Sequence, residues 1–292
     1  MEITIEEALS RGIEAHQAGQ VEEADRFYTL VLNIEPRHPD ANHNMGILAV
    51  NVGQLEQALP FFRTAIEVNP SIDQFWISYT DTLINVGQVH KAKDVIGEYR
   101  KALGITSGYI DAYNNLGVVY AEQGDLDAAI ESYKRILEIQ PDFAEAHNNL
   151  GLANSEKGFV TEAIESYQNA INLRPDYAEA HHNLGIALVE RDGLAAVNSF
   201  KKALNLSPHF SHTYNDLGVV FYEKGEFDLC IELCREVTLV NPSSFEAFYN
   251  IGNALFEKGA MRGALEQYEQ ALKVNPDIAE VQQCYATIQA YL

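Results

Sequence analysis

Asparagine recurs at one position of a regular pattern along this chain of 292 residues. Asn115, Asn149 and Asn183 stand 34 residues apart, each two residues before a glycine. In the other copies of the pattern this position holds Ser10, Asn44, Ser78, Asp216 and Asn250. A side-chain amide both donates and accepts a hydrogen bond, so it can pair with a peptide unit without reading its side chain. The row therefore predicts a site for a polypeptide main chain, centred on Asn115, Asn149 and Asn183.

A second row lies one residue before the first. Its members are His43, Asn114, Asn148, His182, Asn215 and Tyr249. We expect these residues to share the floor of the same groove and to set which side chains a bound peptide can carry. The alternative is that the asparagines link neighbouring copies of the pattern, or simply belong to its consensus. Asparagine is a mediocre helix former, so its recurrence needs a cause under either interpretation.

A row of glutamates follows, five residues after each glycine: Glu122, Glu156, Glu190, Glu223 and Glu257. This position is near the end of a predicted helix, where the helix dipole disfavours a carboxylate. One interpretation is a solvated row of charges that keeps the protein soluble. The other is an acidic rim that selects peptides containing lysine or arginine, with an affinity that falls as salt increases.

Metal binding and catalysis are less well supported by the residues present. Cys230 and Cys234 are four residues apart, with His209 and His212 upstream, but the cysteines occupy positions that hold packing residues in other copies. Free cysteine in such a position behaves as a small buried hydrophobe. The chain has no phosphate-binding loop, no nucleophile elbow and no zinc-protease motif. Its carboxylates follow the repeat, whereas catalysis gathers unlike groups at one place. We expect neither a metal, a cofactor nor an enzyme.

The elements that position these rows are predicted by glycines and prolines that share one period. Gly117 and Gly151 are the first glycines of successive units, a second glycine series, Gly124 and Gly158, follows the midpoints, and Pro141 closes a unit. Two apolar patterns of helical spacing lie between them, so each unit is a helix hairpin. We expect one all-α solenoid domain over 1–292. Its units are 5–38, 39–72, 73–109, 110–143, 144–177, 178–210, 211–244 and 245–278, and 279–292 is a capping helix. The first helices of stacked hairpins should line a concave groove.

Individual residues within the helices and at their ends make this prediction more specific. A glycine inside a helix costs about 1 kcal/mol, so we expect it to pack against a small residue of the paired helix, as Gly117 against Ala129. Asp125 should cap a second helix. Capping boxes are predicted at Asp142…Glu145, Asp176…Glu179, Ser243…Glu246 and Asp277…Glu280. The unit 73–109 is degenerate, with Thr80 for the glycine and three extra residues. It is either a bend or hinge, or a decayed repeat.

These motifs resemble a known family. The pattern Tyr113-x2-Leu116-Gly117-x2-Tyr120…Ala129-x3-Tyr133…Pro141 is similar to the tetratricopeptide repeat (TPR). The asparagine row resembles the ladder of the TPR superhelix of O-GlcNAc transferases, whose amides bind the backbone of an extended peptide. This resemblance implies a right-handed superhelix and a non-catalytic scaffold for protein partners. It also implies an alternative, the substrate-recognition region of a larger or associated glycosyltransferase or other transferase.

The charge composition limits the classes of partner that the chain can bind. Lysine and arginine total 20 against 42 aspartates and glutamates, for a formal charge of −22. Such a chain repels nucleic-acid phosphates and anionic lipids, so we expect protein or peptide partners of basic character, with self-association left open. Three cysteines favour a reducing compartment. No signal peptide and no apolar run of about 18 residues is apparent, so a cytoplasmic location is predicted.

Overall fold

The computed structural model describes residues 3–104 and 106–291. Within these residues the chain is helical throughout and contains no strand. It divides into two compact units, Met1–Pro141 and Asp142–Leu292. The prediction of an all-α solenoid is confirmed, while a single domain over 1–292 stays a prediction because each unit is compact in itself.

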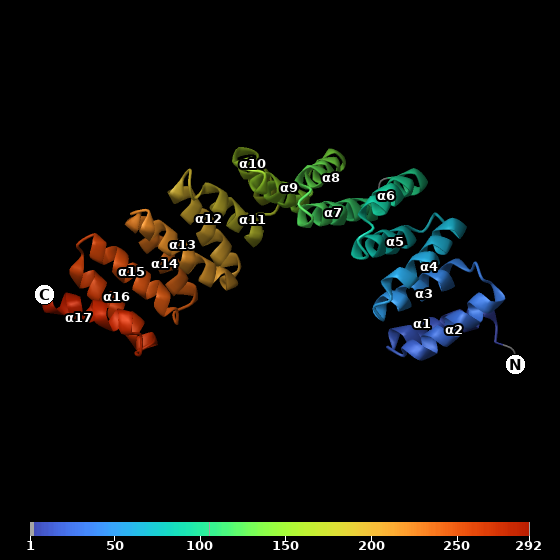
Figure 1. Ribbon diagram of the computed structural model, residues 1–292, viewed down its shortest axis with the longest axis horizontal. Helices are drawn as coiled ribbons and strands as arrows, with labels where there is room; N and C mark the ends of the chain where they lie inside the picture. Colours follow the sequence, from blue (N-terminus) through green and yellow to red (C-terminus); the bar gives the residue numbers. More distant parts are fainter. Residues whose placement is uncertain (1–2, 105, 292) are drawn as a thin grey trace. The chain divides into compact units, whose positions relative to one another are not determined.

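The first unit consists of four helix hairpins, coloured blue to green in Figure 1. The pairs are α1 (Ile5–Gln17) with α2 (Val21–Ile34), α3 (Pro39–Asn51) with α4 (Leu55–Val68), α5 (Asp73–Asn85) with α6 (Val89–Leu103), and α7 (Ser107–Glu122) with α8 (Leu126–Ile139). In each pair the first helix carries the asparagine position and the second helix packs along it.

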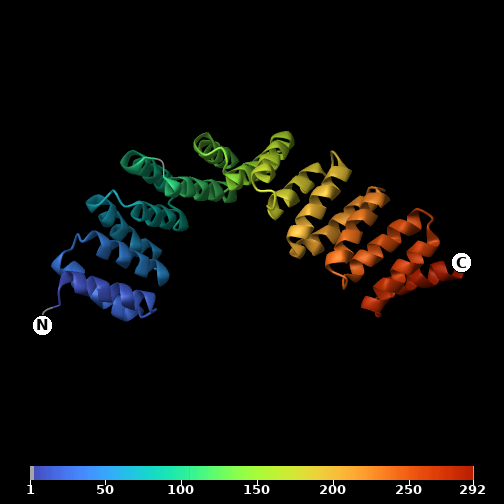
Figure 2. The same cartoon turned by 180° about the vertical axis from the view of Figure 1, so that it is seen from behind.

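The second unit contains four more hairpins and a last helix, seen from the opposite side in Figure 2. The pairs are α9 (Ala144–Glu156) with α10 (Val160–Leu173), α11 (Ala178–Leu188) with α12 (Gly193–Leu206), α13 (Ser211–Glu223) with α14 (Phe227–Val240), and α15 (Phe245–Glu257) with α16 (Met261–Val274). A short 3-10 turn, η1 (Pro208–Phe210), precedes α13, and α17 (Ala279–Tyr291) ends the unit. Val281 and Ile288 of α17 are buried in one cluster with Tyr268, so this helix packs on the last hairpin.

The glycine inside each first helix faces an aromatic ring of the second helix. A Cβ at Gly117 would lie 2.6 Å from Cε1 of Tyr133, and one at Gly151 would lie 2.5 Å from Cε1 of Tyr167. The other pairs of this kind are Gly12–Tyr28, Gly46–Phe62, Gly185–Phe200 and Gly252–Tyr268. The predicted contact with a small residue such as Ala129 is therefore wrong. The missing side chain makes room for a ring, and the ring supplies the buried surface.

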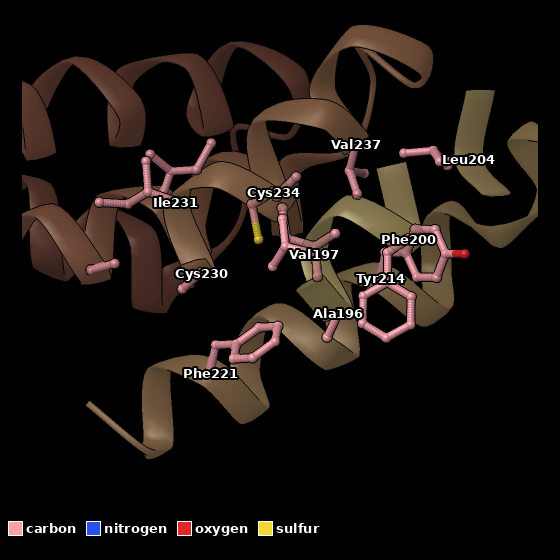
Figure 3. Packing of buried hydrophobic residues seen from close by; sticks show 14 of the residues in the cluster. Ala196, Val197, Phe200, Leu204, Tyr214, Phe221, Cys230, Ile231, Cys234 and Val237 are labelled. Carbon is pink, nitrogen blue, oxygen red and sulfur yellow. The ribbon is translucent and has the colours of Figure 1, made fainter. Parts of the chain in front are cut away.

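Two hairpins fill this position differently. In α5 and α6, Thr80 and Ile96 replace the glycine and the ring, and both are fully buried. In α13 and α14, a Cβ at Gly218 would lie 2.5 Å from Sγ of Cys234. Cys234 and Cys230 are fully buried in the cluster shown in Figure 3. The cysteines therefore act as packing residues.

The turns inside and between hairpins are built from glycine and aspartate. Gly124 and its equivalents in six other hairpins have positive φ, which glycine adopts at the end of a helix without strain. Asp125 caps α8 through a bond from the backbone N–H of Ala128, as predicted. The capping boxes are wrong at the starts of α9 and α11, where the N-cap residues are Phe143 and Tyr177 and no side chain caps.

At the start of α15 the N-cap is Ser244 rather than the predicted Ser243. Gly193, which the sequence places among the midpoint glycines, instead opens α12 after the N-cap Asp192. At the starts of α9, α11 and α15 the N-cap residue thus lies one position after the predicted one.

The degenerate third hairpin is tied to the fourth by polar contacts. The three extra residues lengthen α7, which begins at Ser107 after the N-cap Thr106. The hydroxyl of Tyr99 donates to the carboxylate of Asp73 and lies 2.8 Å from Oγ1 of Thr106. The hydroxyl of Thr106 donates to the same carboxylate at 2.9 Å. The ring of Tyr99 stacks on Trp76 with centroids 5.6 Å apart. The insertion is therefore helical, and the junction carries its own hydrogen-bond network.

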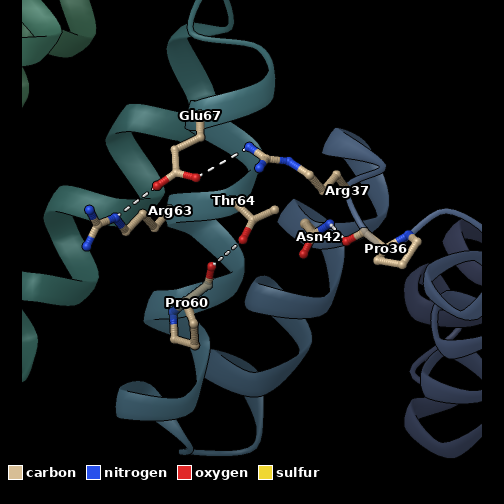
Figure 4. A network of polar contacts seen from close by, with 7 residues as sticks. All are labelled: Pro36, Arg37, Asn42, Pro60, Arg63, Thr64 and Glu67. Carbon is tan, nitrogen blue, oxygen red and sulfur yellow. Dashed lines mark hydrogen bonds and ion pairs between the residues drawn. The ribbon is translucent and has the colours of Figure 1, made fainter.

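The first two hairpins also contain polar contacts. Arg37 reaches Glu67 of α4 at 3.4 Å, and Arg63 reaches the same carboxylate at 3.1 Å (Figure 4). Within α3 and its preceding turn, the amide of Asn42 donates to the carbonyl of Pro36 at 3.0 Å. Exposed ion pairs such as these contribute at most about 1 kcal/mol each, so buried apolar contacts hold the hairpins together.

Candidate functional site

An exposed stripe runs along each of the helices α9 and α11. On α9 it consists of the exposed residues Glu145, Leu152 and Glu156 together with half-buried Asn149. On α11 the equivalent residues are Glu179, Asn183 and Ile186, and Glu190 follows in the turn after the helix. Residues three, four and seven apart share one face of a helix. Each stripe therefore places an amide and an aliphatic side chain between two carboxylates.

The stripe continues with variations on the next two first helices. On α13 it holds His212, Asp216, Val219 and Glu223, all exposed, and on α15 it holds Glu246, Asn250, Asn253 and Glu257. Asn250 is only 9% exposed, so α15 offers less of its amide than α9 or α11. In the second unit the accessible part of the asparagine row is consequently on α9 and α11, with a carboxylate on α13.

Several amides of the row bind the neighbouring first helix. Nδ2 of Asn183 donates to Oδ1 of Asn148 at 3.0 Å, and Nδ2 of Asn250 donates to the backbone carbonyl of Asn215 at 3.4 Å. In the first unit, Nδ2 of exposed Asn115 donates to Asp81 at 3.1 Å. The row therefore links successive hairpins, which is the alternative that the sequence left open. This linkage uses the donating end of each amide.

The side-chain oxygens of these amides differ from the nitrogens in their hydrogen bonding. Oδ1 of half-buried Asn183 accepts no hydrogen bond from the part of the chain that the structure describes. Asn44 on α3 and Asn149 on α9 are also half-buried. An amide that cross-links two helices through its N–H group can still accept from a ligand, so the two interpretations of the row are compatible.

The row that precedes the asparagines lies deeper. Asn114, Asn148 and Asn215 are 6%, 4% and 5% exposed. Nδ2 of Asn215 donates to Ser244 at 2.8 Å, while its Oδ1 has no partner among the described residues. These side chains support the exposed stripe from beneath and offer a ligand little surface. Their role in selecting peptide side chains stays a prediction.

The aromatic members of this row are half-buried. His182 stacks on Phe210 with ring centroids 4.7 Å apart, and its Nδ1 lies 3.3 Å from the hydroxyl of Tyr214. Burial lowers the pKa of His182, and the nearby carboxylate of Glu179 opposes that effect. Tyr249 packs against Tyr268 at 6.0 Å. In the first unit, burial also lowers the pKa of His43, whose Nε2 contacts Ser78 at 3.0 Å. These rings pack between helices.

The glutamate row is exposed at all five positions, Glu122, Glu156, Glu190, Glu223 and Glu257. Two of the carboxylates already have partners: Glu190 pairs with Lys224, and Glu257 accepts from the hydroxyl of Tyr222 at 3.3 Å. Glu156 and Glu223 are the members whose carboxylates remain most available in the second unit.

Two further rows were not recognised in the sequence as parts of the site, and the members of the second were predicted only as capping residues. Lys157, Lys224 and Lys258 each follow a glutamate of the rim. Lys224 and Lys258 form ion pairs with Glu190 and Asp228, and Nζ of Lys157 lies 5.2 Å from the ring centroid of Phe159. Lys224 therefore neutralises Glu190 of the rim, whereas Lys258 pairs with Asp228 outside it.

The second unrecognised row is a set of carboxylates four residues before the asparagine position, Glu145, Glu179 and Glu246. The repeated spacing Glu-x3-Asn was a visible signal. Carboxylates in a first helical turn also stabilise the helix dipole, so their function is not limited to ligand binding. They give the stripe an acidic edge on the side opposite the glutamate row.

Metal and membrane sites have no support in the geometry. Among the residues that the structure describes, no group of three or more histidine, cysteine, aspartate or glutamate side chains could hold a metal ion. In the same residues, no helix combines the length and the apolar character needed to cross a membrane.

Comparisons with known proteins identify the repeat. A TPR repeat model matches residues 117–158 and 155–191, and two tetratricopeptide repeat models match residues 245–278 and 39–72. These matches fall on both units and agree with the hairpins described above. The chain therefore carries tetratricopeptide repeats in both units. Stacked hairpins of this family form extended binding surfaces, and the protein is an interaction scaffold in this general sense.

Several solved structures are similar to this chain over 59% to 96% of its length. The crystal structure of MamA protein is 30% identical, with 59% of this chain and 94% of that chain covered and a TM-score of 0.46. The structure of YrrB, a TPR protein with an unusual peptide-binding site, is 21% identical, with 62% and 92% covered and a TM-score of 0.47. The Cut9–Hcn1 hetero-tetramer of the APC/C is 16% identical, with 96% and 55% covered and a TM-score of 0.46. Among curated proteins, none matches the chain. The finer resemblance to O-GlcNAc transferases stays a prediction.

Proposed function

We propose that the protein is a non-catalytic scaffold that binds an extended, basic segment of a partner protein on the first helices of its second unit. The observation that supports this most directly is the stripe of α9 and α11, in which an amide lies between two carboxylates on the exposed face. A surface of this kind has polar groups for a main chain and negative charge for flanking lysines or arginines.

The amides suit a main chain that has no internal hydrogen bonds. Oδ1 of Asn183 has no donor among the described residues and can accept from a peptide N–H. Asp216, at the same position of α13, is exposed and can accept in the same way. An extended peptide leaves its N–H and C=O groups free for such contacts, whereas a helix uses them internally.

The charge of the stripe favours basic ligands. Its carboxylates in the second unit are those of Glu145, Glu156, Glu179, Glu190, Asp216, Glu223, Glu246 and Glu257. Lysines beside them already contact Glu190, Asp228 and the ring of Phe159. A cationic segment therefore meets an excess of negative charge, and its binding should weaken with salt because exposed charges are screened over about 8 Å at physiological ionic strength.

The non-catalytic part of the proposal is supported by the repetition of the polar groups. Amides and carboxylates recur on successive helices at equivalent positions, and no described site gathers a nucleophile, a base and an oxyanion-binding group. The chain is expected to bind its partner without changing it covalently. Turnover of a bound peptide by the purified protein would contradict this part of the proposal.

The peptide-binding role is tested by fluorescence anisotropy with labelled basic peptides selected from an array. We expect the double variant Asn149→Ala/Asn183→Ala to bind roughly tenfold more weakly, because a net hydrogen bond contributes about 1 kcal/mol. Asn172→Ala is the matched control, since Asn172 is an exposed asparagine on the second helix α10. Equal affinities for the double variant and the wild type would remove the amides from the binding site.

A further inference from the structure

One second helix of the first unit is basic, although the chain as a whole is acidic. This helix is α6, labelled in Figure 1, and its charged residues are Lys91, Lys93, Arg100 and Lys101 against Asp94 and Glu98. Five of the other second helices carry more carboxylates than cations, and α16 carries equal numbers. The excess of cations on α6 therefore runs against the formal charge of −22.

The cations of α6 form no ion pair with any residue that the structure describes. Nζ of Lys91 instead lies 5.9 Å from the ring centroid of Tyr79. The other second helix with an excess of cations is α12, whose Lys201 pairs with Glu232 and Glu236 at 3.1 and 3.0 Å. The charge of Lys201 is thus compensated within the protein, whereas the charge of α6 is open to a ligand.

Most of the cations of α6 lie on one face of the helix, together with a histidine and a glycine. The members of this basic face are His90, Lys93, Gly97, Arg100 and Lys101. Steps of three or four residues keep side chains on one face of a helix. All five residues are exposed except Gly97, which is half-buried, and the two carboxylates of α6 lie along one edge of the face.

Gly97, in the middle of the basic face, has no packing partner that explains it. A Cβ at this position would meet nothing within 4 Å. The equivalent residues of the other second helices all have side chains: Thr29, Arg63, Lys134, Gln168, Lys201, Arg235 and Glu269. Glycine is a poor helix former, so it weakens α6 without any compensating contact inside the chain. A glycine does, however, allow the backbone of a ligand to approach the helix closely.

The basic face ends beside a cavity of about 500 Å³, which Arg100 lines together with Tyr109 of α7 and residues of α8. The charged residues that α8 contributes are Asp127, Glu131, Lys134, Arg135 and Glu138. Arg135 is bound to Glu131 at 2.9 Å. Because cations and carboxylates are equal in number here, the cavity is not itself an anion site. It gives a side chain of a ligand room beside Arg100.

We propose that the basic face of α6 binds an acidic segment of a partner protein. The carboxylates of the segment face Lys93, Arg100 and Lys101, and its main chain passes over Gly97. This surface differs from the stripe of the second unit in its location and in the charge of its ligand, so the inference does not rest on the proposed function.

A short acidic segment fits this surface better than a membrane or a nucleic acid does. An extended anionic surface would also face the helices α4 and α8, which carry more carboxylates than cations, and would be repelled by them. Exposed charges are screened over about 8 Å at physiological ionic strength. A segment confined to α6 therefore responds mainly to the basic face.

Binding is tested with the full chain by fluorescence anisotropy, using a labelled polyglutamate peptide and a polyglutamine peptide of the same length. We expect the polyglutamate peptide to bind, with an affinity that falls as salt increases, and the polyglutamine peptide not to bind. Equal affinities for the two peptides, or no binding of polyglutamate, would overturn the proposal.

A charge variant locates the contact. Lys93→Gln/Lys101→Gln should weaken polyglutamate binding roughly fivefold at physiological salt, since each exposed ion pair contributes modestly. The matched control is Lys202→Gln/Arg235→Gln, which removes the same charge from exposed positions of α12 and α14. It should remain within roughly twofold of the wild type, because distant charges are screened. Equal losses in the two variants would assign the effect to net charge and contradict the location.

The role of Gly97 is tested by Gly97→Gln. Glutamine is a better helix former than glycine, so the urea midpoint of unfolding should rise. Polyglutamate binding should nevertheless weaken by roughly threefold or more, because the new side chain covers the middle of the basic face. An unchanged affinity would show that the ligand does not pass over Gly97.

Other occupants give different results. Tighter binding of phosphatidylserine vesicles or of an oligonucleotide than of polyglutamate, lost in Lys93→Gln/Lys101→Gln, would replace the acidic segment by an extended anionic surface. A dimer in light scattering that this variant abolishes would make the occupant a second copy of the chain. Binding of basic peptides is measured separately, so failure of this inference leaves the proposed function standing.

Discussion

The side chains of Asn183 and Asn148, which belong to successive hairpins, are joined by a 3.0 Å hydrogen bond from Nδ2 of the first to Oδ1 of the second. Asn148 is 4% exposed, whereas Asn183 reaches the surface. One amide is thus a structural acceptor between helices, and the other combines that contact with an oxygen available to a ligand. The two neighbouring rows of asparagine consequently differ in function, although they are adjacent in the sequence.

Replacement of Asn148 by alanine is expected to lower stability more than binding. The change removes the acceptor of Asn183 from a buried site and should reduce the free energy of unfolding by about 1–2 kcal/mol. Urea titration followed by circular dichroism measures this loss. Asn172→Ala should change it by no more than about 0.5 kcal/mol, as exposed substitutions usually do. A loss no larger than that of the control would show that the contact does not stabilise the unit.

Substitution of Gly151 tests the contact between this glycine and the ring of Tyr167. Gly151→Ala would place a Cβ 2.5 Å from Cε1 of Tyr167, so the hairpin must open or the ring must move. Overpacking of this kind typically costs about 1–3 kcal/mol, measured here by thermal or urea unfolding. Gly97→Ala is the control, because its Cβ would meet nothing within 4 Å and alanine is the better helix former. That substitution should stabilise the protein by up to about 1 kcal/mol.

The third hairpin suggests a second substitution that should restore stability to a variant at Gly151. Thr80 and Ile96 are both fully buried where the other hairpins hold a glycine and, in most cases, a ring. Gly151→Thr/Tyr167→Ile should therefore be more stable than Gly151→Thr alone. A double variant no more stable than the single one would show that the exchange depends on other residues of α5 and α6.

The pH dependence of stability has a predictable sign at His182. Burial lowers the pKa of its imidazole in the folded protein, while Glu179 raises it and His209 lowers it. The unfolded chain therefore binds the proton more readily, and the stabilisation is present above the ordinary pKa of about 6.5 and is lost as pH falls through the lowered value. His182→Phe should show a smaller fall in stability between pH 7.5 and 5.5. A fall equal to that of the wild type would contradict the assignment.

The glutamate row, or rim, is tested by changing the salt concentration and by removing two of its charges. Glu156→Gln/Glu223→Gln should weaken binding of a lysine-rich peptide by roughly two- to fivefold at low salt, since exposed ion pairs contribute about 0.2–1 kcal/mol each. The difference from the wild type should shrink as salt increases. Glu165→Gln, on exposed α10 surface, is the control. An affinity independent of salt would leave the rim as a solubility feature only.

Most of the fold could be predicted because glycine and proline mark the repeat directly. The position of Gly117 within a first helix indicated a close contact, but glycine does not specify which atoms fill the space. The ring of Tyr133 fills it, at a position that the sequence had assigned only to the apolar pattern of its helix. The capping boxes failed because Asp142 and Asp176 lie in the turn, one residue before the N-cap residues Phe143 and Tyr177.

The candidate site was only partly predictable. The sequence located the asparagine and glutamate rows, because polar residues at a fixed position of an apolar helix stand out. It could not show that Asn183 binds Asn148, since the two residues are 35 positions apart in the sequence and their contact depends on the distance between two helices. The exposure of Leu152 and Ile186 in this stripe was not predicted, because aliphatic residues at such helical positions are usually packing residues.

The burial of Cys230 and Cys234 leaves one thiol within easy reach of a reagent. Both side chains are fully buried, whereas Cys284 on α17 is half-buried. Because a thiol must be accessible to react, a maleimide dye should attach to the native wild-type chain at Cys284 alone, and mass spectrometry should show one adduct before denaturation and three after it. The protein thus carries a natural point for single-site labelling, at which a fluorophore or spin probe can follow the second unit without cysteine replacement.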